Sequence, residues 1–334
     1  MSRDLGTCLV IGGGGFLGSA LVRRLRAQGV RVRVLGRHVY EPLAELGAEC
    51  VRGDIRRPSD VSGACEGCDT VFNTAAVCDV VPDRQLYYDV NVSGCENVIA
   101  ACRERHVRRF VFTSSPSVVM GAGDIVDGDE SLPYQKRYLS PYPETKALAE
   151  RMVLAANGDG LLTCALRPHL LWGAGDPHIL PVMLRMADSG RLRRIGNGRN
   201  RVSITHVGNA AHAHILAAEE LCGEARCAGK AYFVNDEAPV NLWQWISDLL
   251  VSLGRPPVTR SVPWPLAHAV AWSCELLARV FPFRTDFTRF VTDSMARTHT
   301  FRYDAAARDF GYAPIVPPEQ GLEALVNAHT MRNT

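Results

Sequence analysis

The stretch CLVIGGGGFLGSALVRRLRAQG, residues 8–29, joins an apolar run, a cluster of glycines and an amphipathic segment that ends near Gly29. The apolar run is typical of a buried strand, and the apolar positions after Gly15 recur with helical spacing. Gly12, Gly15 and Gly18 keep the spacing GxxGxxG. Glycines at these positions allow a sharp turn and bring backbone N–H groups and a helix N-terminus against a pyrophosphate. The stretch therefore predicts a strand, turn and helix that bind a dinucleotide.

The same alternation continues along the chain. Further apolar runs are typical of strands, with helical stretches between most of them, at residues 30–36, 48–55, 69–76, 108–115 and 161–169. Such alternation produces right-handed crossovers and a parallel sheet, with ligands at the carboxyl ends of the strands. The sequence therefore predicts an α/β fold, a Rossmann-type doubly wound parallel sheet with a smaller C-terminal substrate domain. We expect residues 1–170 to form the NAD(P)-binding part, with later segments returning to it, and residues 171–334 to form mainly the substrate-binding or lid region.

Composition places the chain among ordinary globular proteins. It has 334 residues, of which 47% are hydrophobic and 22% charged, and its formal net charge is +2. The arginines cluster only locally, so nothing indicates nucleic-acid binding. The 11 cysteines are scattered through apolar segments and no signal peptide precedes the first strand, which favours a reducing cytoplasm over a disulfide framework. Cys65 and Cys68 form a CxxC without a second pair at zinc spacing, so we interpret them as packing residues and expect no metal site.

The end of the second predicted strand indicates which cofactor binds. An acidic residue there accepts from the ribose 2′-hydroxyl of NAD, whereas an arginine accommodates the 2′-phosphate of NADP. Arg37 follows Gly36, and no acid occurs before Glu41. The sequence favours NADP(H), with NAD(H) as the alternative if Arg37 is only a solvated side chain. Asp54, in the GDI sequence after the third strand, is placed to accept from the adenine amino group unless it only forms a turn.

The segment SPYPETKALAE, residues 140–150, places Tyr142 four residues before Lys146 at the start of a predicted helix. Residues with this spacing share one helix face, so the hydroxyl and ammonium groups converge above the sheet. A nearby cation stabilises phenolate and lowers the pKa of the tyrosine, which then exchanges a proton with an alcohol or ketone at neutral pH. Ser115, at the end of the fifth predicted strand, supplies a second hydroxyl to the same oxygen. Such a pair also occurs on helices without chemistry, but here it follows a glycine-rich turn and a serine at a strand end.

Motifs spread over most of the chain resemble a known family. They are GGGGFLG, GDI, VFNTAA, NVSGCENVIAACRE, FVFTSSPSVV, YPETKALAE, LRPHLLWGAGDP, IGNGRNRVSITHVGNAAHAHILAAEEL, GKAYFVNDEAPV and FGYAPIVPPEQGLEAL. On these motifs the chain resembles the extended short-chain dehydrogenase/reductases, and among them the 3β-hydroxysteroid dehydrogenase family. The resemblance implies that Ser115, Tyr142 and Lys146 are the catalytic residues. The cofactor contacts that we expect are Gly12, Gly15, Phe16, Leu17, Gly18, Arg37, Asp54, Ile55, Ala75, Ala76, Lys146 and Pro168.

Within the family the chain is most similar to enzymes of two activities, both of which interconvert a β-hydroxy acid and a β-keto acid. The first, which we expect here, is the NAD(P)-dependent oxidation of the 3β-hydroxyl of a 4-carboxysterol to a ketone with loss of the 4-carboxyl group, as in sterol C-4 demethylation. The alternative is the NADPH-dependent reduction of 2-alkyl-3-oxoalkanoates in long-chain olefin synthesis. Epimerases and dehydratases use the same scaffold, and an alternative of another class is a non-catalytic NADP-binding regulator. Ile11, Ser203 and His206 depart from the residues that the family pattern leads us to expect.

Candidate partners of the substrate lie after the sixth predicted strand. We expect Arg167 to anchor that turn, and His169 to meet the substrate carboxylate with a charge that changes near neutral pH. His206 is the next candidate. The apolar segment 262–283 is too interrupted to span a membrane and forms a core helix, a lid or an amphipathic surface helix. We therefore expect a hydrophobic small-molecule substrate, a homodimer, and a cytoplasmic protein whose membrane contact, where it occurs, is peripheral and uses residues 262–283.

Overall fold

Parallel strands form the main sheet of the molecule. The computed structural model describes residues 3–78, 83–280 and 287–333. In spatial order the strands are β12 (Lys230–Val234), β7 (Leu162–Pro168), β5 (Arg109–Thr113), β4 (Thr70–Asn73), β1 (Thr7–Ile11), β2 (Arg31–Gly36) and β3 (Glu49–Arg52). Every neighbouring pair in this sheet is parallel. The predicted Rossmann-type α/β class is confirmed, and the strand order reverses between β1 and β4, where such sheets bind ligands.

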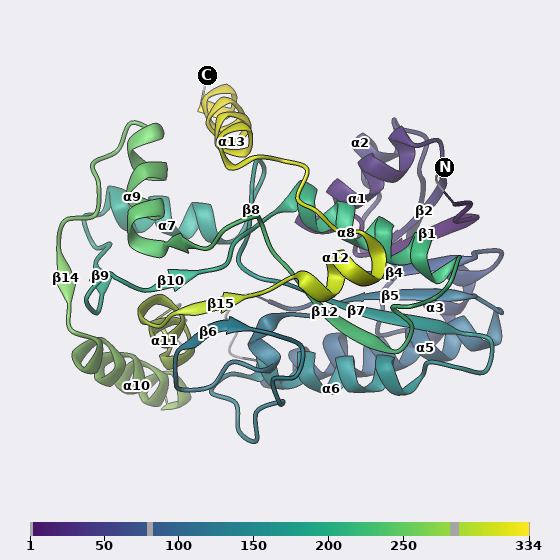
Figure 1. Cartoon of the computed structure of the whole chain (residues 1–334), viewed down its shortest axis with the longest axis horizontal. Helices are drawn as coiled ribbons and strands as arrows, with labels where there is room; N and C mark the ends of the chain where they lie inside the picture. The colour runs from purple at the N-terminus through teal and green to yellow at the C-terminus, as the bar shows by residue number, and fades with distance from the viewer. Residues whose placement is uncertain (1–2, 79–82, 281–286, 334) are drawn as a thin grey trace.

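Helices cover both faces of this sheet (Figure 1). One face carries α1 (Phe16–Ala27), α8 (Val207–Leu221) and α12 (Asp304–Phe310), and the other carries α3 (Pro58–Cys65), α5 (Gly94–Glu104) and α6 (Pro141–Ala155). Short elements connect them: α2 (Glu41–Ala44), α4 (Arg84–Tyr87), η1 (Tyr88–Ser93) and η2 (Pro116–Val118). Cys65 and Cys68 are free thiols buried in the core under α3 and α5, which agrees with a packing role.

A smaller region is built beside the carboxyl ends of the main strands. Its four-stranded sheet has the order β13 (Val240–Asn241), β10 (Arg201–Val202), β15 (His299–Phe301) and β6 (Ile125–Gly128). Two strand pairs accompany it, β11 (Thr205–His206) with β8 (Leu171–Trp172) and β14 (Ser261–Val262) with β9 (Arg194–Ile195). Its helices are α7 (Ile179–Asp188), α9 (Leu242–Ser252), α10 (Trp264–Val280), α11 (Arg289–Ala296) and α13 (Pro318–Asn333).

The two regions exchange segments of the chain. Strand β12, late in the sequence, forms an edge of the main sheet, and β6, from the first half of the sequence, forms an edge of the small sheet. A single boundary near residue 170 therefore does not describe how the strands are shared.

The predicted apolar segment 262–283 lies mostly in α10, at the outer edge of the small region (Figure 1). Its Phe281 and Phe283 lie outside the described residues. The helix buries Ala267 and Ala271. It exposes between 45% and 56% of five larger apolar side chains, namely Leu266, Val270, Trp272, Leu276 and Leu277. Within the described residues, no helix combines the length and apolar character needed to cross a membrane, and peripheral contact through this helix stays a prediction.

Candidate active site

The predicted site residues gather along one edge of the main sheet. Most of them lie at or just after the carboxyl ends of β1, β2, β3, β4, β5 and β7, and in parallel strands these ends share one edge. The glycine turn follows β1, and Ala75 and Ala76 follow β4, its neighbour in the sheet. Pro168 ends β7 on the other side of β5. The edge therefore offers a continuous path from β3 to β7.

The glycine turn between β1 and α1 forms a cradle that a side chain would fill. A Cβ built on Gly12, whose φ is +79°, would lie 2.8 Å from the backbone nitrogen of Ala75. A Cβ on Gly18 would lie 2.2 Å from the carbonyl oxygen of Gly12. Gly15 is the N-cap of α1, which begins with Phe16 and Leu17, and no side chain in the described part of the chain caps this helix. The uncapped N–H groups and the close backbone suit a bound pyrophosphate.

Tyr40 covers the glycine turn, and sequence reasoning missed it. A Cβ built on Gly14 would lie 2.0 Å from Cε1 of the Tyr40 ring, and one on Gly36 would lie 2.6 Å from Cε2. The ring therefore rests on two backbone segments that only glycine leaves open. An aromatic residue three positions after Arg37 carries no sequence signal that would single it out.

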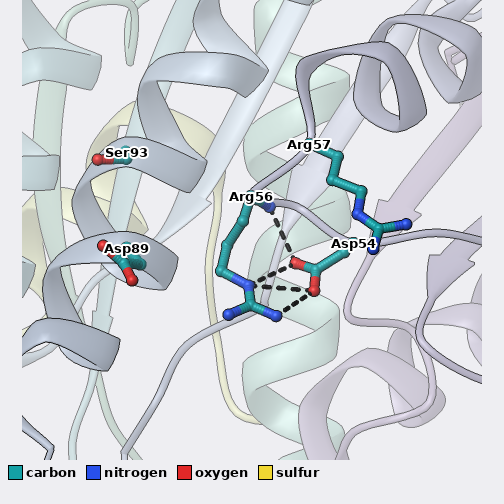
Figure 2. Close-up of a pocket in the computed structure, with 5 residues that line it drawn as sticks. All are labelled: Asp54, Arg56, Arg57, Asp89 and Ser93. Carbon is teal, nitrogen blue, oxygen red and sulfur yellow. Dashed lines mark hydrogen bonds and ion pairs between the residues drawn. The ribbon is translucent and has the colours of Figure 1, made fainter.

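The end of the path at β3 contains a hollow of about 340 Å³. It is lined by Asp54, Arg56, Arg57, Asp89 and Ser93. Figure 2 shows Arg56 folded back onto the Asp54 carboxylate, with Asp89 and Ser93 on the facing helix. Hydrogen bonds from Arg56 hold the pKa of Asp54 below its usual value. The carboxylate is thus ionised and able to accept, although the sequence did not indicate Arg56 as its partner.

Arg37 and Ile55 are two further predicted cofactor contacts, and their side chains differ in exposure. Arg37 follows β2 and is exposed, as expected for a group that meets a 2′-phosphate. Ile55 is 8% exposed and packs in the core between β3 and α5. The contact of each with a cofactor stays a prediction.

Ser115 lies just beyond β5 as the N-cap of η2. Its Oγ accepts hydrogen bonds from the backbone nitrogen of Ser117 at 3.2 Å and from the Ser117 hydroxyl at 2.9 Å. Because both contacts use the oxygen as an acceptor, the Ser115 hydroxyl can donate its proton, and its hydrogen bond with Tyr142 lowers the pKa of that phenol. A hydroxyl held in this way can donate to an oxygen placed between it and Tyr142.

Tyr142 opens α6, in the first turn of the helix. The Ser140 hydroxyl caps the helix and accepts from the backbone nitrogen of Tyr142 at 3.4 Å, and Pro141 occupies the first helical position, where its missing N–H costs nothing. Burial raises the pKa of Tyr142, and a hydrogen bond with Ser115 opposes that rise. The phenol is therefore protonated at neutral pH.

Lys146 does not act on Tyr142 in the way that the sequence suggested. Its Nζ donates to the carbonyl oxygen of Thr113 and lies 4.0 Å from the centroid of the Phe112 ring. Lys146 is only 2% exposed, and burial lowers its pKa to about 8. The expectation that the ammonium lowers the pKa of Tyr142 is wrong for this structure, because desolvation dominates and the ammonium is engaged at the end of β5.

The two predicted substrate histidines have different surroundings. The His169 ring lies edge-on to His299 and Phe301, with centroids 5.9 and 5.4 Å away. Burial lowers the pKa of His169 to about 3, so the expectation that its charge changes near neutral pH is wrong. His206 caps α8 by accepting from Gly208 at 3.1 Å. This hydrogen bond gives His206 a structural role at the start of α8, and a substrate role for His206 stays a prediction.

Arg167 anchors the turn after β7. Its guanidinium donates to both carboxylate oxygens of Glu150, at 2.6 and 2.9 Å, and the Tyr134 hydroxyl donates to the same carboxylate at 2.6 Å. Arg167 and Glu150 are both almost fully buried. A buried pair of this kind holds α6 against β7, which agrees with the expectation that Arg167 anchors the turn.

Cys78 and His178 meet near Tyr142, and the sequence did not indicate either residue. The Cys78 thiol is exposed and lies 3.8 Å from Nε2 of His178, at the start of α7. Cys78 also lies close enough to Tyr142 to affect its pKa. The described residues contain no group of three or more histidine, cysteine or acidic side chains placed to hold a metal ion.

Comparisons with known proteins agree with this geometry. The model of the 3-beta hydroxysteroid dehydrogenase/isomerase family matches residues 9–265. The chain is 41% identical to the 2-alkyl-3-oxoalkanoate reductase of Shewanella oneidensis, over 97% of this chain and 87% of that protein. It is 36% identical to the decarboxylating sterol-4-alpha-carboxylate 3-dehydrogenase of Mus musculus, over 97% of this chain and 91% of that protein. Among solved structures, gox2253 is 27% identical with a TM-score of 0.76, covering 99% of both chains. MoeE5 in complex with UDP-glucose and NAD is 25% identical with a TM-score of 0.75, covering 98% of this chain and all of that one.

Proposed function

The chain belongs to the 3-beta hydroxysteroid dehydrogenase/isomerase family and is an oxidoreductase, and from this we propose the specific reaction that it catalyses. The reaction is the NADPH-dependent reduction of a 2-alkyl-3-oxoalkanoate to the 3-hydroxy acid. The sequence motifs alone placed a sterol substrate first. Identity of 41% to a 2-alkyl-3-oxoalkanoate reductase, against 36% to a sterol-4-alpha-carboxylate 3-dehydrogenase, supports the opposite order.

The observation that carries the proposal is a protonated phenol hydrogen-bonded to a serine that can donate its proton. A tyrosine holds its proton at neutral pH, burial raises the pKa of Tyr142 further, and Ser115 uses its oxygen as an acceptor toward Ser117. During reduction, the ketone oxygen accepts a hydrogen bond from Ser115 and a proton from Tyr142 while carbon 3 accepts a hydride. One hydride and one proton convert the C=O group to CH–OH, so the reaction balances.

NADP(H) fits the residues along the sheet edge. When bound, the nicotinamide supplies the hydride. The glycine turn and the uncapped N-terminus of α1 would hold the pyrophosphate, and exposed Arg37 would meet the 2′-phosphate. Asp54 would accept from the adenine amino group, and Lys146 would donate to the nicotinamide ribose. NAD(H) is the second candidate, since MoeE5 is a similar structure solved with NAD.

An apolar cluster of side chains follows the predicted nicotinamide loop, and these side chains leave a space of only about 10 Å³ between them. It begins directly after His169 and lies between β8, α7, α9 and α13. Its lining is almost entirely apolar and includes Leu170, Leu171, Trp172, Ile179, Leu180, Met183, Trp245, Leu249 and Leu325. A long alkyl substituent would fit among these side chains only after they move apart, and it would then contact an apolar lining.

The test is turnover with defined substrates. The purified protein, NADPH and a long-chain 2-alkyl-3-oxoalkanoate should give the 3-hydroxy acid, detected by mass spectrometry, with one NADPH consumed per product. Tyr142→Phe is the control that separates enzymatic turnover from contamination. Binding of NADPH without turnover of any offered substrate would favour the non-catalytic regulator. Conversion of a substrate to an isomer or to a dehydrated product, without net consumption of NADPH, would favour an epimerase or dehydratase.

Oxidation of a 4-carboxysterol is the second candidate function, supported by 36% identity to the mouse enzyme over nearly the whole chain. Its assay is incubation of the protein with NAD or NADP and a 4-carboxysterol, measuring the 3-ketone and released carbon dioxide. A turnover rate that exceeds that of the 2-alkyl-3-oxoalkanoate would reverse the order of the two proposals.

A further inference from the structure

Thr113, the last residue of β5, is contacted from both faces of the main sheet. Lys146, on α6, donates from Nζ to the Thr113 carbonyl oxygen. On the other face, Thr113 Oγ1 lies 2.8 Å from Nε2 of His214, on α8. Lys146 is 2% exposed and His214 is fully buried, so no bulk solvent competes for either contact. One residue thus joins the catalytic lysine to a histidine that no sequence motif assigned to the site.

The direction of each hydrogen bond that links His214 to Thr113 and to Ala210 is fixed. Nδ1 of His214 lies 2.7 Å from the carbonyl oxygen of Ala210, one turn earlier in α8. Because a carbonyl only accepts, Nδ1 carries the proton and Nε2 is left as an acceptor. The Thr113 hydroxyl must therefore donate to Nε2. Burial lowers the pKa of His214 to about 4, so the ring is neutral and keeps this arrangement over the working pH range.

Few groups other than Thr113 define where the ammonium lies. The charged or titratable groups that act on Lys146 are Cys95 on α5, Glu150 on α6 and Cys78 after β4, and His214 on α8 also interacts with it electrostatically. Glu150 is already bound by Arg167 and Tyr134, and Phe112 supplies a ring face rather than a directional acceptor. The Thr113 carbonyl is therefore the directional contact that sets the position of Nζ.

We propose that His214 and Thr113 are positioning residues that hold Lys146 in place. The bond from Thr113 to His214 restrains the end of β5, and the carbonyl of the same residue then orients the ammonium. Ser115 follows two residues later, so the pair also limits where its hydroxyl lies. This inference rests on the proposed function, because the proposed function is what gives Lys146 a role in cofactor contact and proton transfer.

The deciding variants change one hydroxyl at a time. Thr113→Val removes the donor to His214 and keeps the carbonyl and the side-chain volume, whereas Thr113→Ser keeps the donor. Thr163→Val is the matched control, because the buried Thr163 hydroxyl on β7 donates to the Val153 carbonyl at 2.8 Å, at the opposite end of a neighbouring strand. His214→Leu removes the acceptor from the other side.

Thr113→Val should lower kcat for the 3-oxo acid roughly 10- to 100-fold, because small misplacements of a catalytic group are costly. A hydrogen bond to the charged form favours that form, so a loosened bond should lower the pKa of Lys146 further and move the basic limb of the pH profile to lower pH. Thr113→Ser should restore kcat to within about threefold of wild type, a difference below 1 kcal/mol, and should return the basic limb to its wild-type pH. The double variant Thr113→Val with His214→Leu should be no worse than the poorer single variant, as expected for residues that act as one unit.

Two results would overturn the inference. One is a Thr113→Val protein that behaves like Thr163→Val, with lower thermal stability but unchanged kcat and pH profile. The other is a Thr113→Ser protein that is as impaired as Thr113→Val. If the wild-type protein reduces no 3-oxo acid, the proposed function fails, and NADPH binding by the same variants, followed by fluorescence as a function of pH, still decides whether the pair positions Lys146.

Discussion

The side of the site proposed for the cofactor and the side proposed for the substrate, called the cofactor side and the substrate side, are built in different ways. The cofactor side consists of strand ends and the turns that directly follow them, from the glycine turn after β1 to Pro168 at the end of β7. On the substrate side, segments distant in sequence meet: His169 packs against His299 and Phe301 of β15, and β6 completes the sheet that contains them. Local spacing therefore specifies the first side, and tertiary packing specifies the second.

The difference also affects how charges behave on the two sides. Asp54 and Arg37 lie at the open end of the cofactor path, where Arg56 keeps the carboxylate ionised. His169 and His206 are desolvated, and burial lowers the pKa of both well below neutrality. Ionic recognition is thus available for the cofactor, while these two histidines offer a substrate only neutral imidazoles.

Removal of the Tyr142 hydroxyl should have the largest effect, because this residue lies where the two sides meet. Tyr142→Phe should lower kcat by about 100- to 10,000-fold, the usual contribution of a general acid, because the proton donor is lost. The dissociation constant of NADPH should change little. Steady-state kinetics and fluorescence titration measure the two quantities, and a variant within tenfold of wild type would remove Tyr142 from its assigned role.

Lys146→Met should reduce turnover and cofactor affinity while making the protein more stable at neutral pH. The pKa of Lys146 falls from 10.5 to about 8 on folding because of burial. Between these values the unfolded chain binds the extra proton, so stability rises as pH increases from about 8 to 10.5, and the full cost of the buried charge is present below pH 8. That cost is on the order of 3 kcal/mol.

Thermal unfolding at pH 7 and pH 10 measures the effect of Lys146→Met. The melting temperature of the variant should exceed that of wild type at pH 7, and the gap should narrow at pH 10. Lys136→Met, at an exposed lysine, is the control and should show neither change. A Lys146→Met protein that is less stable than wild type at pH 7 would mean that the contacts with Thr113 and Phe112 outweigh the desolvation of the ammonium.

The sequence predicted some features of the site and not others. The glycine spacing predicted the turn after β1, and helical spacing correctly placed Tyr142 and Lys146 on the first turns of α6. The direction of the pKa shift of Tyr142 could not be read from spacing, because it depends on desolvation by segments that pack around it. His214 and Tyr40 were missed for the same reason, since each reaches the site only through tertiary packing.

Arg37→Ala tests the cofactor side alone. Loss of a hydrogen bond to a charged phosphate costs about 1.5–3 kcal/mol, so NADP(H) should bind roughly 10- to 150-fold more weakly while NAD(H) binding changes little. Arg31→Ala, at the exposed opposite end of β2, is the matched control for the loss of one positive charge. Equal losses of affinity for both cofactors in Arg37→Ala would assign Arg37 to the general electrostatic field rather than to 2′-phosphate recognition.

His169→Ala tests the substrate side and should have the smallest effect of the four. Because burial keeps the imidazole neutral, it contributes packing against His299 and Phe301 and at most one hydrogen bond, so kcat/KM should fall only about threefold to tenfold. The fall should be the same for a 2-alkyl-3-oxoalkanoate and for its methyl ester, and the ratio of the two should not change between pH 6 and pH 9, because no charge on His169 titrates in that range. A loss confined to the free acid would show instead that substrate binding recruits His169 as a carboxylate partner. In that case recognition on the substrate side would depend on charge after all, and the contrast between the two sides would hold only for the protein without its ligands.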